Sequence, residues 1–201
     1  MIEYPQYSHL PEAYIQSKIS EFLAEDMPDG DITTDNIISE TVQVTAEIRA
    51  IEGLTFAGTE IVPHFFGPSC SIKLFKSDGE LAKSGEVLGT IQGPAKIILS
   101  CERVMLNLMQ RLCGIASVSR KYVQLAHAHN VKILDTRKTT PGLRLFEKYA
   151  IAVGGAYNHR LNLSEGILIK DNHIHSAGSV ITAIQSVTAL NLDFPLEIEV
   201  D

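Results

Sequence analysis

The spacing of apolar residues divides the chain into two halves with different rhythms. In residues 11–24 the apolar positions recur at helical intervals: Tyr14, Ile15, Ile19, Phe22 and Leu23. Short strand-like runs follow at residues 42–50, 54–57, 71–75 and 86–91, most of them bounded by glycine or by charged turns. The first half is therefore expected to form a helix and an antiparallel sheet.

Two more helices are predicted before the rhythm changes. Ser100 fits the N-cap of a helix over residues 101–112, because Val104, Leu108 and Leu112 would line one face of it. A second helix is predicted over residues 117–128. Gly114 lies between the two and is expected to separate them.

In the second half, strand and helix patterns alternate. Buried strands are predicted at residues 131–135, 167–169 and 196–200, and helices at 143–152 and 177–190. The last helix would turn four apolar residues inward: Val180, Ile181, Ile184 and Val187. This alternation is typical of a parallel βα arrangement. Because the printed chain stops directly after a strand, where a parallel sheet leaves a face open, we expect a truncated chain or a fragment of a longer protein.

Composition narrows the class of protein. The 201 residues, 45% hydrophobic and 20% charged, allow one large domain or two small ones, and the net charge of −7 gives no support to nucleic-acid binding. Three widely spaced cysteines without a CxxC pair indicate a reducing compartment. We find no signal peptide at the start and no apolar run near the ~18 residues that a membrane span needs. A cytoplasmic protein without membrane contact is expected.

Cationic side chains gather where the predicted parallel strands end, which is where ligands bind in such folds. The residues concerned are Arg137, Lys138, His159, Arg160 and Lys170. A cationic rim in an acidic protein indicates a small, highly anionic ligand.

The types of side chain indicate which anions these are. Arginine forks suit carboxylates, and lysines suit phosphate. Glu197, Glu199 and Asp201 alternate along the last strand and share one face, where they are suited to sugar hydroxyls or to magnesium. Substrates that carry carboxylate, phosphate and ribose fit all three elements, but these residues alone do not define a reaction.

Several motifs together resemble the quinolinate phosphoribosyltransferase family. They are ILDTRKTTPGLR at residues 133–144, then EKYA, GG, NHR and LIKDNHI, with GDITT at 30–34, ERVMLNLMQRLCGI at 102–115 and LEIEV at 196–200. The similarity covers nearly the whole chain in compatible order. It implies an N-terminal α/β sandwich-like domain over residues 1–114, followed by an open α/β barrel over 115–201 that is truncated at its C-terminus.

The resemblance also implies roles for individual residues. Those matching the quinolinate pocket are Arg103, Arg137, His159, Arg160 and Lys170, with Arg103 contributed to a neighbouring subunit. This implies a homodimer or a higher homo-oligomer with shared active sites. Lys138 and Glu199 match catalytic positions near the ribose and pyrophosphate, and Thr136 lies in the same substrate-binding loop.

The implied reaction joins quinolinate to phosphoribosyl pyrophosphate and yields nicotinate mononucleotide, pyrophosphate and CO2, in NAD biosynthesis. Mg²⁺ would arrive with phosphoribosyl pyrophosphate. No metal site within the protein is predicted, because the pair His173 and His175 lacks a third ligand at a recognisable spacing.

Three alternatives stay open. One is a paralogous, molybdenum-associated phosphoribosyltransferase-like protein with another substrate. Another is a fragment that binds quinolinate without turnover, because strands carrying a further acidic residue and phosphate-binding loops in this family are missing from the sequence. The third is a biotinyl- or lipoyl-type carrier, indicated by the turns at residues 78–80 and 85–88 but lacking a lysine on a hairpin tip.

Overall fold

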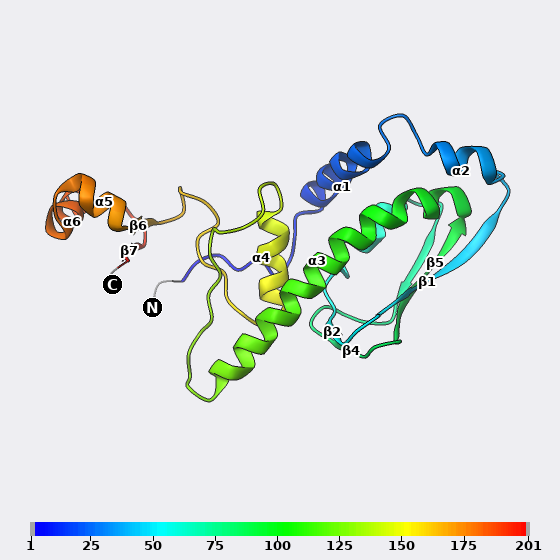
Figure 1. The fold of residues 1–201 in the computed structure, drawn as a ribbon. Coiled ribbons are helices and arrows are strands. Elements are labelled where there is room, and N and C mark those ends of the chain that lie inside the picture. The colour runs from blue at the N-terminus through cyan, green and yellow to red at the C-terminus, as the bar shows by residue number, and fades with distance from the viewer. Residues whose placement is uncertain (1–2, 200–201) are drawn as a thin grey trace.

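The first half of the chain forms an antiparallel sheet packed against a long helix (Figure 1). The computed structural model describes residues 3–199. The main sheet has the order β1 (Gln43–Arg49), β5 (Val87–Pro94), β3 (Ser71–Leu74), and a second pair joins β2 (Leu54–Thr55) to β4 (Leu81–Ala82). The predicted antiparallel sheet is confirmed. The short strand β4 was not predicted.

The helix α3 (Ala95–His127) runs unbroken for 33 residues, so the prediction of two helices separated at Gly114 is wrong. A side chain at Gly114 would meet nothing within 4 Å, and its backbone keeps the helical hydrogen bonds. An exposed glycine costs a helix only ~1 kcal/mol, which the packing of the surrounding turns offsets. Ser100 is also not the N-cap: it lies inside the helix and donates its hydroxyl to Asp31, and the helix begins after Pro94.

Three other helices surround this frame. In α1 (Glu12–Asp26), Ile15 and Ile19 are buried, as the apolar spacing predicted. The helix α4 (Arg144–Val153) also matches its prediction and packs beside α3. The short helix α2 (Ile32–Ile37) was not predicted, although Asp31 caps it by accepting from the Thr34 N–H at 2.9 Å.

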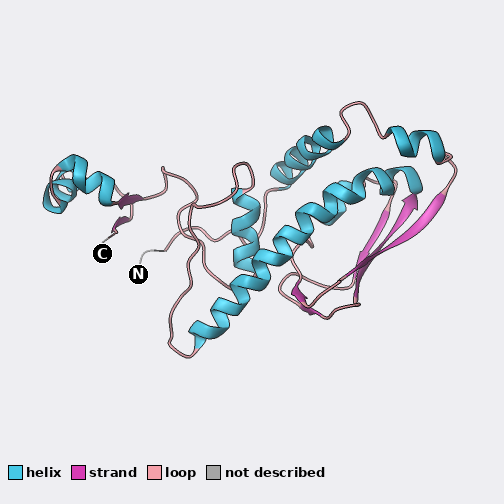
Figure 2. Ribbon diagram, in the orientation of Figure 1, coloured by secondary structure: helices cyan, strands magenta, loops and turns pink. Residues whose placement is uncertain are grey.

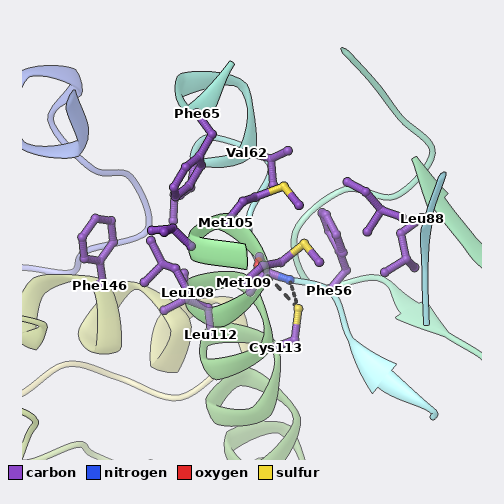
Figure 3. Packing of buried hydrophobic residues seen from close by; sticks show 14 of the residues in the cluster. Phe56, Val62, Phe65, Leu88, Met105, Leu108, Met109, Leu112, Cys113 and Phe146 are labelled. Carbon is purple, nitrogen blue, oxygen red and sulfur yellow. Dashed lines mark hydrogen bonds between the residues drawn. The ribbon is translucent and has the colours of Figure 1, made fainter. Parts of the chain in front are cut away.

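The core lies between α3, the sheet, the 3₁₀ helix η1 (Val62–Phe65) and α4. Figure 3 shows the α3 side chains directed into it, together with residues from the facing elements: Phe56, Val62, Phe65, Leu88, Met105, Leu108, Met109, Leu112, Cys113 and Phe146. The thiol of Cys113 lies 3.4 Å from the backbone nitrogen and 3.5 Å from the carbonyl oxygen of Ala57. The helix is thereby fixed against the strand that ends at Thr55.

The second half contributes a parallel pair of strands at the other end of the molecule (Figure 2). β6 (Ile167–Ile169) pairs with β7 (Leu196–Ile198), and the helices α5 (Asp171–Ala177) and α6 (Val180–Thr188) connect them. Parallel strands joined by helices confirm the predicted βα arrangement. The fold is mixed α/β, and the strands within residues 3–199 do not close into a barrel.

Two expectations about the second half are wrong. Residues 131–135 do not form a buried strand, because only one bridge, between Leu134 and Tyr157, pairs them and Leu134 is 52% exposed. The final helix is shorter than predicted, and Ile181 is 68% exposed, with Ala183 as the helix's buried residue. The apolar pattern in both places lacks a covering element within the described part of the chain.

Among residues 3–199, no helix combines the length and hydrophobicity needed to cross a membrane.

The packing of α3 predicts a large difference between two leucines on the same helix. Leu112 is fully buried, whereas Leu125 is 74% exposed. Replacing Leu112 with alanine should lower the free energy of unfolding by about 2–5 kcal/mol, because it leaves a cavity, and Leu125→Ala should change it by less than ~0.5 kcal/mol. Urea unfolding followed by circular dichroism measures both values. Equal effects would contradict this description of the core.

Candidate functional site

A buried ion pair joins the loop that follows Leu134 to helix α4. The ammonium of Lys148 donates to Asp135 at 2.6 Å, and the two side chains are 1% and 5% exposed. Burial alone lowers the pKa of Lys148, and the neighbouring carboxylate of Asp135 acts in the opposite direction. Such a pair is costly to desolvate and is retained only with good geometry and further hydrogen bonds.

Those further hydrogen bonds come from the segment around Asn158. Its side-chain amide donates to the second carboxylate oxygen of Asp135 at 2.8 Å and to the Lys148 carbonyl at 2.9 Å. The His159 N–H donates to Asp135 at 2.8 Å, and Lys148 donates to the His159 carbonyl at 2.7 Å. Asp135 and Lys148 therefore fix the two segments that carry Arg137 and Arg160.

The far end of the loop is anchored separately. Arg144 donates to the Thr139 hydroxyl at 3.0 Å and to the Leu161 carbonyl at 3.2 Å. From α3, the guanidinium of Arg111 donates to Thr140 and to Glu147, the latter at 2.9 Å from Nε. The loop over residues 135–142 is thus held at both ends.

Three guanidinium groups come together at this place: Arg137, Arg144 and Arg160. Arg160 is buried and donates to the Gly166 carbonyl at 2.6 Å. Desolvation, and then the nearby charges of Arg144 and Arg160, lower the pKa of Arg137. Its Nε atom is buried without a hydrogen-bond partner among the described residues. Excess positive charge with an unsatisfied donor is suited to binding an anion.

Thr136 and Lys138 alternate with Arg137 and line a different space. With Asp135, Glu147 and others they border a cavity of about 300 Å³ next to α3 and α4. The Thr136 hydroxyl accepts from the Lys138 N–H at 3.0 Å, which turns the backbone at this point. The loop therefore presents an arginine and a lysine to separate regions.

The ends of β6 and β7 carry the remaining candidates. Lys170 pairs with Glu199 at 2.5 Å, with side chains 40% and 57% exposed. Exposed pairs are weak, so either partner can exchange for a ligand. His159 contacts both carboxylate oxygens of Glu197 at 3.1 Å. The shared face predicted for Glu197 and Glu199 stays a prediction, and Asp201 lies outside the described residues.

Arg103 is not brought to this cluster within the chain. It is exposed on α3, beside a cavity of about 300 Å³ that is also bordered by Asp26, Asp31 and Ser100. Its predicted place in a neighbouring subunit's site stays a prediction.

Sequence reasoning missed several residues that build the site: Asp135, Arg144, Lys148 and Asn158. A lysine in an apolar helical run is the one signal that was available for Lys148, because a buried lysine requires a partner. No group of three or more possible metal-ligating side chains gathers within the described part of the chain.

Comparison with known proteins defines the family. Residues 31–113 match the N-terminal domain of quinolinate phosphoribosyl transferase, and residues 115–201 match its C-terminal domain. The chain belongs to the quinolinate phosphoribosyltransferase family.

Individual relatives agree with this assignment. The chain is 42% identical to a probable nicotinate-nucleotide pyrophosphorylase [carboxylating] of Bacillus subtilis, over 92% of this chain and 66% of that protein. It is 40% identical to the Mycobacterium leprae nicotinate-nucleotide pyrophosphorylase [carboxylating], over 91% and 66% of the two chains. The nicotinate-nucleotide pyrophosphorylase structure from Francisella tularensis aligns with a TM-score of 0.91 at 34% identity, over 98% and 71%. The chain therefore spans about two thirds of the length of the Bacillus subtilis and Mycobacterium leprae proteins.

The buried pair predicts a strong effect of removing one partner. Lys148→Met should lower the free energy of unfolding by about 3–5 kcal/mol, because the Asp135 carboxylate stays buried without its counter-ion. Lys121→Met, at an exposed position of α3, is the matched control and should have little effect. The double variant Lys148→Met/Asp135→Asn should recover part of the loss. Chemical denaturation measures all three, and a Lys148→Met protein as stable as the control would show that the pair is unimportant.

Proposed function

We propose that this chain carries the quinolinate- and phosphoribosyl-binding site of a decarboxylating quinolinate phosphoribosyltransferase, a pentosyltransferase of NAD biosynthesis. The observation that carries the proposal is the guanidinium cluster of Arg137, Arg144 and Arg160, with the buried, unpartnered Nε of Arg137. Family membership supports the same substrate. Quinolinate carries two carboxylates on adjacent ring carbons, so it supplies the paired negative charge that this cluster lacks.

In this proposal Arg137, His159, Arg160 and Lys170 bind quinolinate. Arg160 is held against the Gly166 carbonyl, which leaves the rest of its guanidinium for a carboxylate. Lys170 is released from its exposed pair with Glu199 when the two substrates enter. Arg103 completes the pocket of a neighbouring subunit, which makes the active form a homodimer or a higher homo-oligomer.

Lys138, Thr136 and Glu199 serve the second substrate, phosphoribosyl pyrophosphate. Lys138 lies in the cavity beside α3 and α4 and neutralises the departing pyrophosphate. Glu199, exposed at the end of β7, anchors ribose hydroxyls and stabilises positive charge on the sugar. Mg²⁺ usually binds one or two carboxylates plus substrate phosphate and keeps several waters, so one exposed carboxylate fits an ion that arrives with the pyrophosphate.

The chemistry then has two steps. The pyridine nitrogen forms a bond to the anomeric carbon while the bond from that carbon to the pyrophosphate oxygen breaks, and pyrophosphate leaves with the electron pair. Holding the nitrogen against the anomeric carbon supplies much of the acceleration. The carboxylate beside the now positively charged nitrogen leaves as CO2, and the ring carbon takes a proton. Nicotinate mononucleotide is the product.

The proposed organisation follows the same reasoning. Residues 1–114 form the N-terminal sandwich-like domain and residues 115–201 part of an open barrel, within a cytoplasmic enzyme. Because the chain covers 66% of the length of the Bacillus subtilis and Mycobacterium leprae relatives, binding of quinolinate without turnover is the second candidate. A molybdenum-associated paralogue would bind another aromatic acid in preference to quinolinate.

The test combines calorimetric binding of quinolinate with an assay of nicotinate mononucleotide formation in the presence of phosphoribosyl pyrophosphate and Mg²⁺. Arg137→Ala should weaken quinolinate binding by about 10- to 100-fold, the effect expected for one hydrogen-bonded charge. The matched control is Arg49→Ala, which removes an exposed arginine paired with Glu47 on β1. It should bind as the unmodified chain does.

Turnover that Arg137→Ala abolishes would support the enzyme, and binding without turnover would support the second candidate. Absence of both would refute the proposed substrate.

A further inference from the structure

The N-terminal segment lies alongside the site, although it is nearly 200 residues away from β7 in the sequence (Figure 1). Gln6 and Tyr7 hold the backbone and side chain of Asn158. The Gln6 side chain accepts from the Asn158 N–H at 2.8 Å and donates to its carbonyl at 3.1 Å, and the Tyr7 N–H donates to its side-chain oxygen at 2.7 Å. Three hydrogen bonds to one residue fix the start of the segment that carries His159 and Arg160.

Tyr4 extends this contact to the histidine. It is 7% exposed, and its hydroxyl donates to Glu197 at 2.7 Å. Its ring packs against the His159 ring with centroids 4.5 Å apart. Glu197 in turn contacts the Nε2 atom of His159 at 3.1 Å. Tyrosine, glutamate and histidine therefore form a connected group drawn from the N-terminal segment, β7 and the segment after α4.

The ionisation states of Glu197 and Tyr4 determine which atom donates in each hydrogen bond of this group. Partial burial opposes ionisation of Glu197, but hydrogen bonds from Tyr4 and His159 outweigh it and lower the pKa of that carboxyl. Burial, and then the hydrogen bond to Glu197, raise the pKa of Tyr4 to about 12. Tyr4 is thus a donor and Glu197 an ionised acceptor, so the proton between Glu197 and His159 must reside on Nε2. Only the Nδ1 edge of His159 is left for a ligand.

The tyrosine also constrains the support of Arg160. A side chain at Gly166 would come within 2.9 Å of the Tyr4 hydroxyl oxygen, so a larger residue there would displace Tyr4. The carbonyl of Gly166 is the acceptor that holds Arg160. Tyr4 therefore contacts the supports of both residues: Glu197, which holds His159, and Gly166, which holds Arg160.

We propose that residues 3–7 are a positioning segment for the quinolinate pocket, in which Tyr4 holds Glu197 and Glu197 accepts the Nε2 proton of His159, leaving its Nδ1 edge toward the substrate. Because quinolinate carboxylates only accept hydrogen bonds, Nδ1 binds them as the N–H donor of an imidazolium. Neither Tyr4 nor Glu197 touches the substrate in this arrangement. The inference rests on the proposed function for the identity of the ligand, but not for the orientation of His159. The charged or titratable groups around the histidine are Tyr4, Asp135, Lys148, Arg160 and Glu197.

The experiment compares Tyr4→Phe with Tyr7→Phe. Tyr7 is a matched control in the same segment, because phenylalanine keeps the backbone N–H that donates to Asn158 and removes only a hydroxyl that donates to Glu165 at 3.1 Å. Proton and ¹⁵N NMR of the full 201-residue chain reports whether the His159 Nε2 proton is retained and how fast it exchanges with water, and calorimetry reports quinolinate affinity. Tyr4→Phe should accelerate that exchange and weaken quinolinate binding by about tenfold each, the effect of losing one hydrogen bond to a charged group.

Tyr7→Phe should leave both quantities unchanged, and phosphoribosyl pyrophosphate binding should be the same in both variants. Glu197→Gln, which keeps the shape of the side chain, should reproduce the effect of Tyr4→Phe on His159. If Tyr4→Phe and Glu197→Gln leave the exchange rate equal to that of Tyr7→Phe, the positioning role is overturned. If Tyr4→Phe loses the protected His159 Nε2 proton while the unmodified chain does not bind quinolinate, the positioning role is supported and the proposed ligand is overturned.

Discussion

The buried contact between Asp135 and Lys148 is the interaction on which the rest of the site depends. It connects three parts of the chain that no shared sheet holds together: the loop after Leu134, helix α4 and the segment over residues 158–160. A single parallel bridge between Leu134 and Tyr157 would hold the first and third parts only loosely. The buried charges replace the extended strand pairing that a sheet would supply, and both carboxylate oxygens of Asp135 accept hydrogen bonds.

This arrangement explains how an acidic protein presents a cationic site. The backbone carbonyls of Leu161 and Gly166 and the hydroxyl of Thr139 hold Arg144 and Arg160, and within residues 3–199 neither guanidinium forms an ion pair with a carboxylate. The carboxylates of the site bind other partners: Asp135 binds Lys148, Glu197 binds Tyr4 and His159, and Glu147 binds Arg111. The net positive potential is therefore retained at the guanidinium groups, where a dicarboxylate gains most from it.

The sequence predicted those parts of the fold that local periodicity defines. The helix with Ile15 and Ile19 inward, the antiparallel sheet and the parallel strands around Ile169 were all visible in the apolar pattern. The prediction of a helix break at Gly114 was wrong because tertiary packing on both sides outweighs the weak helix propensity of glycine. The prediction of a buried strand at residues 131–135 was wrong because an apolar run indicates burial but does not show which element covers it.

The candidate site was predictable only in part for a related reason. Arg137 and Arg160 stand in recognisable motifs, and the structure brings them together. Tyr4, by contrast, lies in a segment without periodicity, and its contact with Glu197 spans 193 residues. No local pattern carries information about such a contact. Arg144 was likewise hidden, because only the fold shows that its charge adds to those of its two neighbours.

The most direct test of the central claim is a crystal structure of this chain grown with quinolinate. The claim is that the cluster built around Asp135 and Lys148 is a dicarboxylate site. We predict the ligand with its carboxylates on Arg137 and Arg160 and with the Asp135–Lys148 contact unchanged. Quinolinate bound elsewhere, for example in the cavity of about 290 Å³ bordered by Phe22 and Arg111, would contradict it.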